Sequence, residues 1–140
     1  MIIGILGEGK LDQRVAIAAE HIPSLLAYKA EKILVETNAG RLAGSLDADY
    51  QAKGAEIASR QDVIAKSDVI INIHPIDSAE LAQLRGKVLI GGYNPLVNTA
   101  FVSACLSNGV SAFSLDVIPR TTRAQAMDIL SSMATVSGYK

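Results

Sequence analysis

The chain has 140 residues, enough for one domain with a single substantial core. Hydrophobic residues make up 49% and charged residues 19%, which is typical of a folded protein and excludes a disordered one. Thirteen basic residues against fourteen acidic ones leave a net charge of −1, and aromatic residues are only 4%, so the composition offers no surface for nucleic acid.

The mean hydropathy of +0.28 is high, but no apolar run approaches the ~20 residues that a membrane span requires. We therefore expect no direct membrane insertion, and the N-terminus lacks the pattern of a signal peptide. The high apolarity is typical of a parallel sheet buried on both faces, although part of it could form a surface for a partner. Cys105 is the only cysteine, which excludes an internal disulfide and favours a reducing compartment.

Six short apolar runs rich in β-branched residues predict strands over residues 1–6, 32–36, 55–58, 68–73, 87–92 and 110–118. Helical spacing between them predicts helices over residues 13–30, 47–54, 60–67, 77–86 and 98–109. Pro23 is expected to kink or divide the first helix. The alternation predicts a single α/β domain of three layers, with a mainly parallel sheet and helices on both faces, flavodoxin- or Rossmann-like.

In such a sheet, ligands bind beyond the carboxyl ends of the strands. The loops after five of the predicted strands are rich in Gly, Asn, Pro or Arg: GEGKLDQR, TNAGRLAG, HPID, YNPLVN and PRTTRAQ. We expect these loops to gather along one edge of the sheet.

The stretch GILGEGKL (residues 4–11) matches a phosphate-binding loop up to its last position. Leu11 stands where a Ser or Thr would hold magnesium, and Gly4 is expected to lie inside the first strand. The glycine spacing does not match the dinucleotide fingerprint either. The sequence therefore predicts a strand-to-helix turn rather than a triphosphate site. Its polar side chains could still contact a polar ligand: Glu8, Lys10, Asp12 and Arg14.

Three further residues are candidates for chemistry. His21 is expected at the surface of a helix, and Cys105 in the core. His74 ends a buried strand, where a base could face a ligand, although a structural role is favoured. The histidines have no neighbouring carboxylate-and-Cys set, so no metal site is predicted.

The segment IPRTTRAQAMDILSSM (residues 118–133) predicts a helix with an apolar stripe formed by Ala126, Ile129, Leu130 and Met133. Arg120 and Arg123 fall near the predicted start, where their charge opposes the helix macrodipole. Cations at that place favour a bound anion such as a pyrophosphate. The alternative is a solvated helix start.

This segment also carries a family resemblance. PRTTRAQAMDILSSMATVSGYK resembles the signature Pro-Arg-x-x-Arg-Ala-Gln-x-Met-Asp-x-Leu-Ser-Ser of the nicotinamide nucleotide transhydrogenase α subunit. VETNAGRLAGSLDADYQAKGAEI and GEGKLDQRVA resemble the N-terminal domain shared by alanine dehydrogenases and transhydrogenases. The resemblance covers nearly the whole chain in order. It implies that residues 1–140 are this N-terminal domain, with the family's NAD-binding Rossmann domain outside them.

The resemblance distinguishes the two branches of the family. The alanine dehydrogenase branch uses a Lys at the end of the fourth strand and a His after the fifth. Asn72 and the loop YNPLVN stand at those positions here. An amino acid dehydrogenase without both would lack a carboxylate clamp and a general acid. This favours the transhydrogenase, while an alanine dehydrogenase-like fragment and a non-catalytic nucleotide-binding or regulatory module stay as alternatives.

The transhydrogenase resemblance implies an oxidoreductase that transfers hydride directly between NAD(H), bound by this component, and NADP(H) on a partner domain, coupled to proton translocation. This segment would supply the nicotinamide-facing wall, with Gln125 at the junction of the two nucleotides. The catalytic residues implied are Arg120, Gln125, Asp128 and Ser131. The cofactor-binding residues implied are Arg120, Arg123, Asp128, Ser131 and Ser132. No metal is expected. Hydride transfer requires two rings at near-attack distance rather than an acid or base, which suits such residues.

The resemblance also implies partners and a location. The expected partners are the rest of the α subunit with its Rossmann domain, and the β subunit with its NADP(H) domain. A homodimer is expected in the full enzyme. The location implied is the cytoplasm, or the cytoplasmic side of the inner membrane as a peripheral component. The 140-residue chain alone is expected to be inactive.

Overall fold

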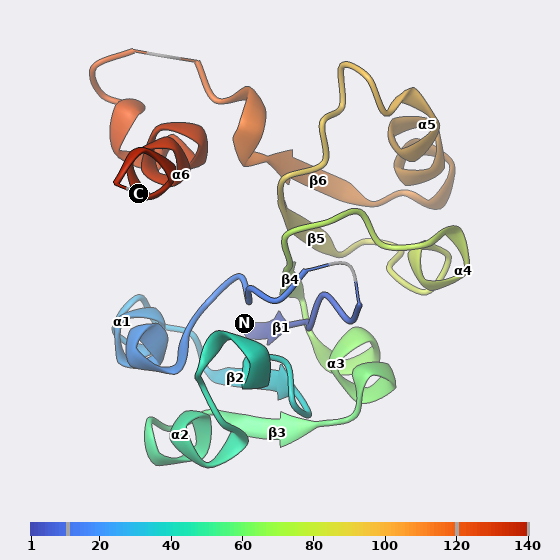
Figure 1. The fold of residues 1–140 in the computed structure, drawn as a ribbon. Helices are drawn as coiled ribbons and strands as arrows, with labels where there is room; N and C mark the ends of the chain where they lie inside the picture. The colour runs from blue at the N-terminus through green and yellow to red at the C-terminus, as the bar shows by residue number, and fades with distance from the viewer. Residues whose placement is uncertain (11, 120, 140) are drawn as a thin grey trace.

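The computed structural model describes residues 1–10, 12–119 and 121–139. Its described part forms a six-stranded sheet with the order β3-β2-β1-β4-β5-β6, and each pairing between neighbours is parallel (Figure 1). The strands are β1 (Ile2–Ile5), β2 (Lys32–Glu36), β3 (Glu56–Ala58), β4 (Val69–Ile71), β5 (Val88–Gly91) and β6 (Ser111–Ser114). The predicted parallel α/β fold is confirmed. The order reverses between β1 and β4, where the two halves of the sheet meet.

Helices cover both faces of the sheet (Figure 1). One face carries α3 (Arg60–Lys66), α4 (Ser78–Leu81) and α5 (Thr99–Asn108), and the other carries α1 (Ile22–Ala27), α2 (Asp47–Ala52) and α6 (Ile129–Gly138). Two clusters of buried side chains lie between these layers, because alternate residues of each strand face opposite sides. Cys105 belongs to the cluster beneath α5, as predicted. The three predicted layers are therefore confirmed.

Gly4 lies where α3 packs closely against β1. A Cβ at this position would lie 2.4 Å from Ser67 Oγ and 2.7 Å from Val63 Cγ1. Gly4 also pairs within the sheet, opposite Leu34 and Ile70. Its predicted place inside the first strand is confirmed, and the packing of α3 explains why a glycine stands there.

The predicted helix over residues 13–30 is wrong in its first part. Residues 12–18 are irregular, with an isolated antiparallel bridge between Gly7 and Val15. A short 3-10 turn, η1 (Ala19–His21), then leads into α1. Pro23 stands in the first turn of α1, where its missing N–H removes no helical hydrogen bond. Pro23 therefore marks the beginning of the helix instead of dividing it.

The predicted helix start near Arg120 and Arg123 is also wrong. After β6 the chain forms two 3-10 turns, η3 (Leu115–Val117) and η4 (Gln125–Met127), and α6 begins only at Ile129. Asp128 is the N-cap of α6, so an acid and not a cation faces the helix dipole. Arg123 lies in the preceding turn, and Arg120 lies outside the described residues.

Several other elements are shorter than predicted, two of them by four residues or more. The helix expected over residues 77–86 is the single turn of α4, and β6 ends at Ser114. A further 3-10 turn, η2 (Arg41–Ala43), follows β2. Within the described ranges, none of the helices has the length and apolarity needed to cross a membrane.

Candidate functional site

The polar loops lie along one edge of the sheet, as predicted, because parallel strands bring their carboxyl ends together. The loops after β1 and β4 are neighbours, since these two strands pair at the centre of the sheet. In open α/β sheets this reversal of strand order is where ligands bind. The candidate site is therefore built around these two loops and the elements that cover them.

Glu8 joins the two central loops. Its side chain is buried, its Oε1 accepts a hydrogen bond from Ile73 N at 2.6 Å, and its Oε2 accepts one from His74 N at 2.9 Å. The carboxylate thus satisfies two backbone donors just beyond β4. The sequence suggested Glu8 as a ligand contact, whereas the structure uses both of its oxygens to fasten the first loop to the sheet.

Asp12, Arg14 and His74 form a second link between the same loops. The Asp12 carboxylate accepts hydrogen bonds from Arg14 Nε at 2.9 and 3.1 Å and from Arg14 Nη2 at 2.5 Å, and lies 3.0 Å from His74 Nε2. The hydrogen bond from the Arg14 side chain holds the pKa of Asp12 well below its usual range, against an opposing effect of burial. The same pair raises the pKa of Arg14. His74 is held by a carboxylate, which agrees with the favoured structural role.

Asn72 forms a buried polar contact at the end of β4. Its Oδ1 accepts a hydrogen bond from the Tyr93 hydroxyl at 2.7 Å, and its Nδ2 donates to the His74 carbonyl. Burial raises the pKa of Tyr93. Gly91 leaves room for this pair, since a Cβ there would lie 2.7 Å from the Tyr93 hydroxyl and 2.2 Å from the Asn72 backbone carbonyl. The position compared with the dehydrogenase lysine thus holds a neutral amide that is already engaged.

An apolar cavity of about 350 Å³ lies between this edge of the sheet and α6. Its walls are residues 14–17, the ends of β4 and β5, and Ile129 and Met133 of α6. Arg14 is the charged member among the described residues that line it, and its Nη1 lies 3.6 Å from Met133 Sδ. A cavity of this size, apolar with few polar groups, suits a small ring.

The start of α6 brings together three residues that the resemblance selected. Asp128 is 8% exposed, and its Oδ1 accepts hydrogen bonds from Leu130 N at 2.9 Å and Ser131 N at 3.3 Å. Its Oδ2 accepts one from the Ser131 hydroxyl at 2.7 Å. The Ser132 hydroxyl donates to the Asp128 carbonyl at 3.2 Å. Asp128, Ser131 and Ser132 are therefore one ordered cluster.

The other selected residues are less constrained. Gln125 and Arg123 are exposed in the turns before α6, and their side chains do not join the Asp128 cluster through any hydrogen bond or ion pair between described residues. Arg120 lies outside the described residues. Within the described ranges, no three His, Cys, Asp or Glu side chains gather as metal ligands would.

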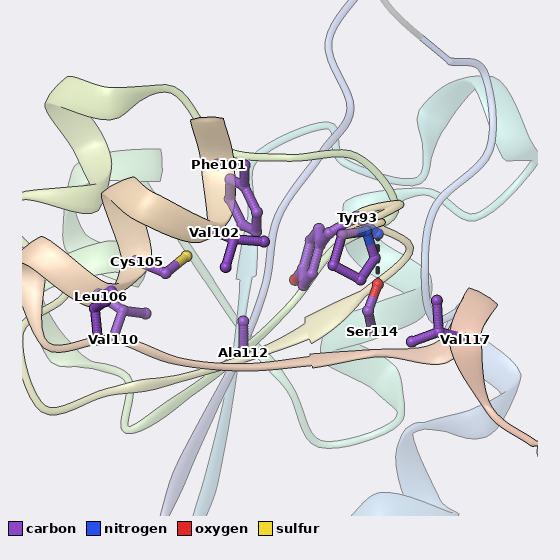
Figure 2. A pocket seen from close by; sticks show the side chains of 10 residues that line it. Tyr93, Phe101, Val102, Cys105, Leu106, Val110, Ala112, Ser114 and Val117 are labelled. Atoms are coloured by element: carbon purple, nitrogen blue, oxygen red, sulfur yellow. Dashed lines mark hydrogen bonds between the residues drawn. The ribbon is translucent and has the colours of Figure 1, made fainter. Parts of the chain in front are cut away.

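A second apolar cavity, of about 330 Å³, opens between α5 and β6 (Figure 2). Figure 2 shows Phe101, Val102 and Cys105 of α5 above Ala112 of the strand. The drawn hydrogen bond runs from Tyr93 N to the Ser114 hydroxyl, at 2.8 Å. The described lining residues include none with a charge, so this cavity has the character of a packing surface rather than of a catalytic site.

Sequence reasoning missed how the first loop contacts the exit of β4. The sequence singles out Asp12, Arg14 and His74 separately, but nothing in their spacing shows that β1 and β4 are neighbours. The available signal was the general rule that α/β sheets reverse their order near the first strand. That rule would have placed the loops after β1 and β4 together.

Comparison with known proteins relates the whole chain to one family. The family model described as "Alanine dehydrogenase/PNT, N-terminal domain" matches residues 4–137. The chain is 31% identical to a Rickettsia prowazekii protein named as the first portion of NAD(P) transhydrogenase subunit alpha, over 99% of this chain and 38% of that protein. It is 36% identical to NAD(P) transhydrogenase subunit alpha of Cereibacter sphaeroides, over 76% of this chain and 21% of that protein.

A solved structure is similar in fold as well as in sequence. The crystal structure of transhydrogenase from Sinorhizobium meliloti superimposes with a TM-score of 0.93 at 32% identity, covering 99% of this chain and 42% of that one. The chain thus spans less than half the length of these relatives.

Proposed function

The chain belongs to the alanine dehydrogenase/PNT N-terminal domain family, and we propose that it is part of the NAD(H)-binding component of a proton-translocating NAD(P) transhydrogenase. This component would take part in direct hydride transfer between NAD(H) and NADP(H). Relatives named as transhydrogenase α subunits support the assignment. The chain spans 38% and 21% of the length of two of these relatives, and we propose a separate dinucleotide-binding Rossmann domain outside residues 1–140.

The observation that carries the proposal is the ordered start of α6 on the carboxyl edge of the sheet. Asp128 and Ser131 hold each other in fixed positions there. We assign them, with Arg120 and Gln125, to the nicotinamide-facing wall. Arg123 and Ser132 would contact nearby phosphate or ribose groups.

These residues have a positioning task in this proposal. The bound dinucleotide supplies the hydride, and the chain's own groups orient its carboxamide and exclude water. An amide or hydroxyl that donates and accepts hydrogen bonds is sufficient for this, because no proton is exchanged with the ring. The fixed Asp128–Ser131 pair would offer acceptor oxygens to the carboxamide N–H groups without side-chain reorganisation.

The structure favours this function over an amino acid dehydrogenase. Asn72 is engaged by Tyr93 and by the His74 carbonyl, so it offers no cationic clamp for a carboxylate. The loop after β5 contains no histidine to act as an acid. The partners proposed are the remainder of the α subunit and a β subunit with its NADP(H) domain. We further propose a homodimer, a cytoplasmic or peripheral inner-membrane location, and no metal cofactor.

The test uses the assembled enzyme that contains this chain. We expect NADPH to reduce an NAD⁺ analogue with no other substrate added, and L-alanine to cause no reduction of NAD⁺. Alanine-dependent reduction of NAD⁺, without transfer between the two nucleotides, would contradict the proposal and support the dehydrogenase alternative.

A further inference from the structure

We propose that Asp12 is a positioning residue. It holds Arg14 against Met133 and thereby fixes the position of α6 on the sheet, which in turn sets the orientation of Asp128 and Ser131. The consequence for hydride transfer rests on the proposed function. How firmly α6 is held on the sheet can be measured independently of that function.

The first step is the restraint that Asp12 places on Arg14. The Asp12 side chain is 14% exposed while that of Arg14 is 48% exposed, so the arginine projects from a more buried carboxylate. Asp12 accepts bonds from the Arg14 backbone at 3.0 Å and from two guanidinium nitrogens. Such a forked ion pair restricts a side chain that would otherwise sample many rotamers.

The second step is that Asp12 is itself anchored to the sheet. Its Oδ2 lies 3.0 Å from His74 Nε2, and the backbone N–H of His74 is bound by Glu8 at 2.9 Å. His74 is thus held at its ring and at its main chain by two acids of the first loop. Asp12 therefore fixes the position of the Arg14 guanidinium relative to the end of β4.

The third step is the contact between Arg14 and α6. Arg14 Nη1 lies 3.6 Å from Met133 Sδ, within reach of a weak hydrogen bond to sulfur. The 350 Å³ cavity lies beneath this part of α6, so the apolar packing of Ile129 and Met133 against the sheet is incomplete. A helix packed in this way depends more strongly on the few contacts at its rim.

The fourth step connects this contact to the proposed site. Met133 follows Ser131 by two residues, which is about 200° around a helix, so the two side chains lie on nearly opposite sides of α6. A rotation of α6 about its axis would move both together. The contact at Met133 on the sheet side therefore fixes the direction in which Ser131 projects on the other side.

The experiment measures backbone hydrogen exchange in α6 of the 140-residue chain. We expect Asp12→Ala and Arg14→Ala each to speed exchange in residues 130–136 by about two- to fivefold, the effect of losing one weak hydrogen bond to α6. The double variant should be no faster than either single one, because both residues act along one path. Arg14→Lys, which keeps the charge without the fork, should resemble Arg14→Ala. The matched control is Asp62→Ala, which removes the exposed pair with Lys66 on α3 and should leave α6 unchanged.

Unchanged exchange of α6 in both single variants would overturn the inference, and so would effects that add fully in the double variant. In the assembled transhydrogenase, Asp12→Ala should lower kcat for hydride transfer more than it alters KM for NADH. Faster exchange with an unaltered kcat would reject the positioning role. A wild-type enzyme without transhydrogenation would reject the proposed function instead, leaving the exchange result to decide the seating of α6.

Discussion

Asp128 and Ser131 are joined twice, once through the Ser131 backbone N–H at 3.3 Å and once through its hydroxyl at 2.7 Å. The first bond caps α6, and the second orients a hydroxyl on the carboxyl edge of the sheet. One carboxylate thus serves helix stability and, in the proposed function, the placement of a ligand. The two tasks respond differently to substitution, so they can be measured separately.

Because Asp128 caps α6, its replacement is expected to lower the stability of the fold. Asp128→Ala removes the acceptor for Leu130 N and Ser131 N and should lower the free energy of unfolding by about 1 kcal/mol. Asp128→Asn should lower it less, because an amide oxygen can still accept these bonds. Urea denaturation followed by circular dichroism measures both. Equal losses in the two variants would contradict the capping role.

The close packing of Gly4 in β1 against α3 predicts that a side chain at this position lowers the stability of the fold. Gly4→Ala should cost about 1–3 kcal/mol, because its Cβ would overlap Ser67 Oγ and Val63 Cγ1. The matched control is Gly92→Ala, whose Cβ would make ordinary contacts of 3.4 Å with Ile73 O and 3.7 Å with Ile129 Cδ1. Denaturation midpoints of the two variants give the comparison, and similar values would show that the close approach is not the cause.

The Ser67 hydroxyl extends this prediction. It is buried and has no hydrogen-bond partner among the described residues. Removing a hydroxyl of this kind loses no bond, so Ser67→Ala alone should be neutral or slightly stabilising. Combined with Gly4→Ala, it should restore part of the lost stability, because the 2.4 Å overlap with Ser67 Oγ is removed while those with Val63 Cγ1 and Ser67 Cβ remain. A double variant no more stable than Gly4→Ala would contradict this account.

The contacts of Asp12 with Arg14 and His74 predict that the stability of the folded chain depends on pH. The pKa of Asp12 is lower in the folded chain than in the unfolded one, chiefly because of the hydrogen bond from Arg14. Its contribution to stability is therefore complete above the ordinary aspartate value of about 3.9 and is lost as the pH falls toward the folded pKa. Wild type should be more stable than Asp12→Asn at pH 7, and the difference should shrink below about pH 4. Thermal unfolding at several pH values measures it, and a difference that grows with acidity would have the wrong sign.

Several features could be predicted from sequence because one physical cause dominates them. The strands were found because burial on both faces requires continuous apolar runs, as in residues 32–36 and 68–73. The first helix begins later than predicted: Val15, Ala18 and Ile22 fit helical spacing, yet Val15 and Ile17 belong to an irregular segment that lines the cavity beside α6. The start of α6 differs from the prediction because the apolar stripe extends back to Ala126, whereas the N-cap Asp128 begins the helix only at Ile129. The link between Asp12 and His74 depends on strand order, which local patterns do not encode.

The isolated chain should bind NADH weakly or not at all. In the proposed function a separate Rossmann domain makes the contacts with the adenosine half, so most contacts with the dinucleotide would be missing from residues 1–140. Calorimetric titration of the 140-residue chain tests this directly. A micromolar dissociation constant would contradict it.

The positional role of Asp128 is the central claim, and single-turnover hydride transfer in the assembled enzyme tests it most directly. Rates are measured for wild type, Asp128→Asn and Asp128→Ala across the pH range in which the enzyme stays folded. If Asp128 only positions the carboxamide, the Asn variant keeps more activity than the Ala variant and the shape of the pH profile is unchanged, because an amide still forms hydrogen bonds. If Asp128 exchanges a proton, Asn and Ala reduce the rate equally and a titrating limb of the profile disappears, which would contradict the account.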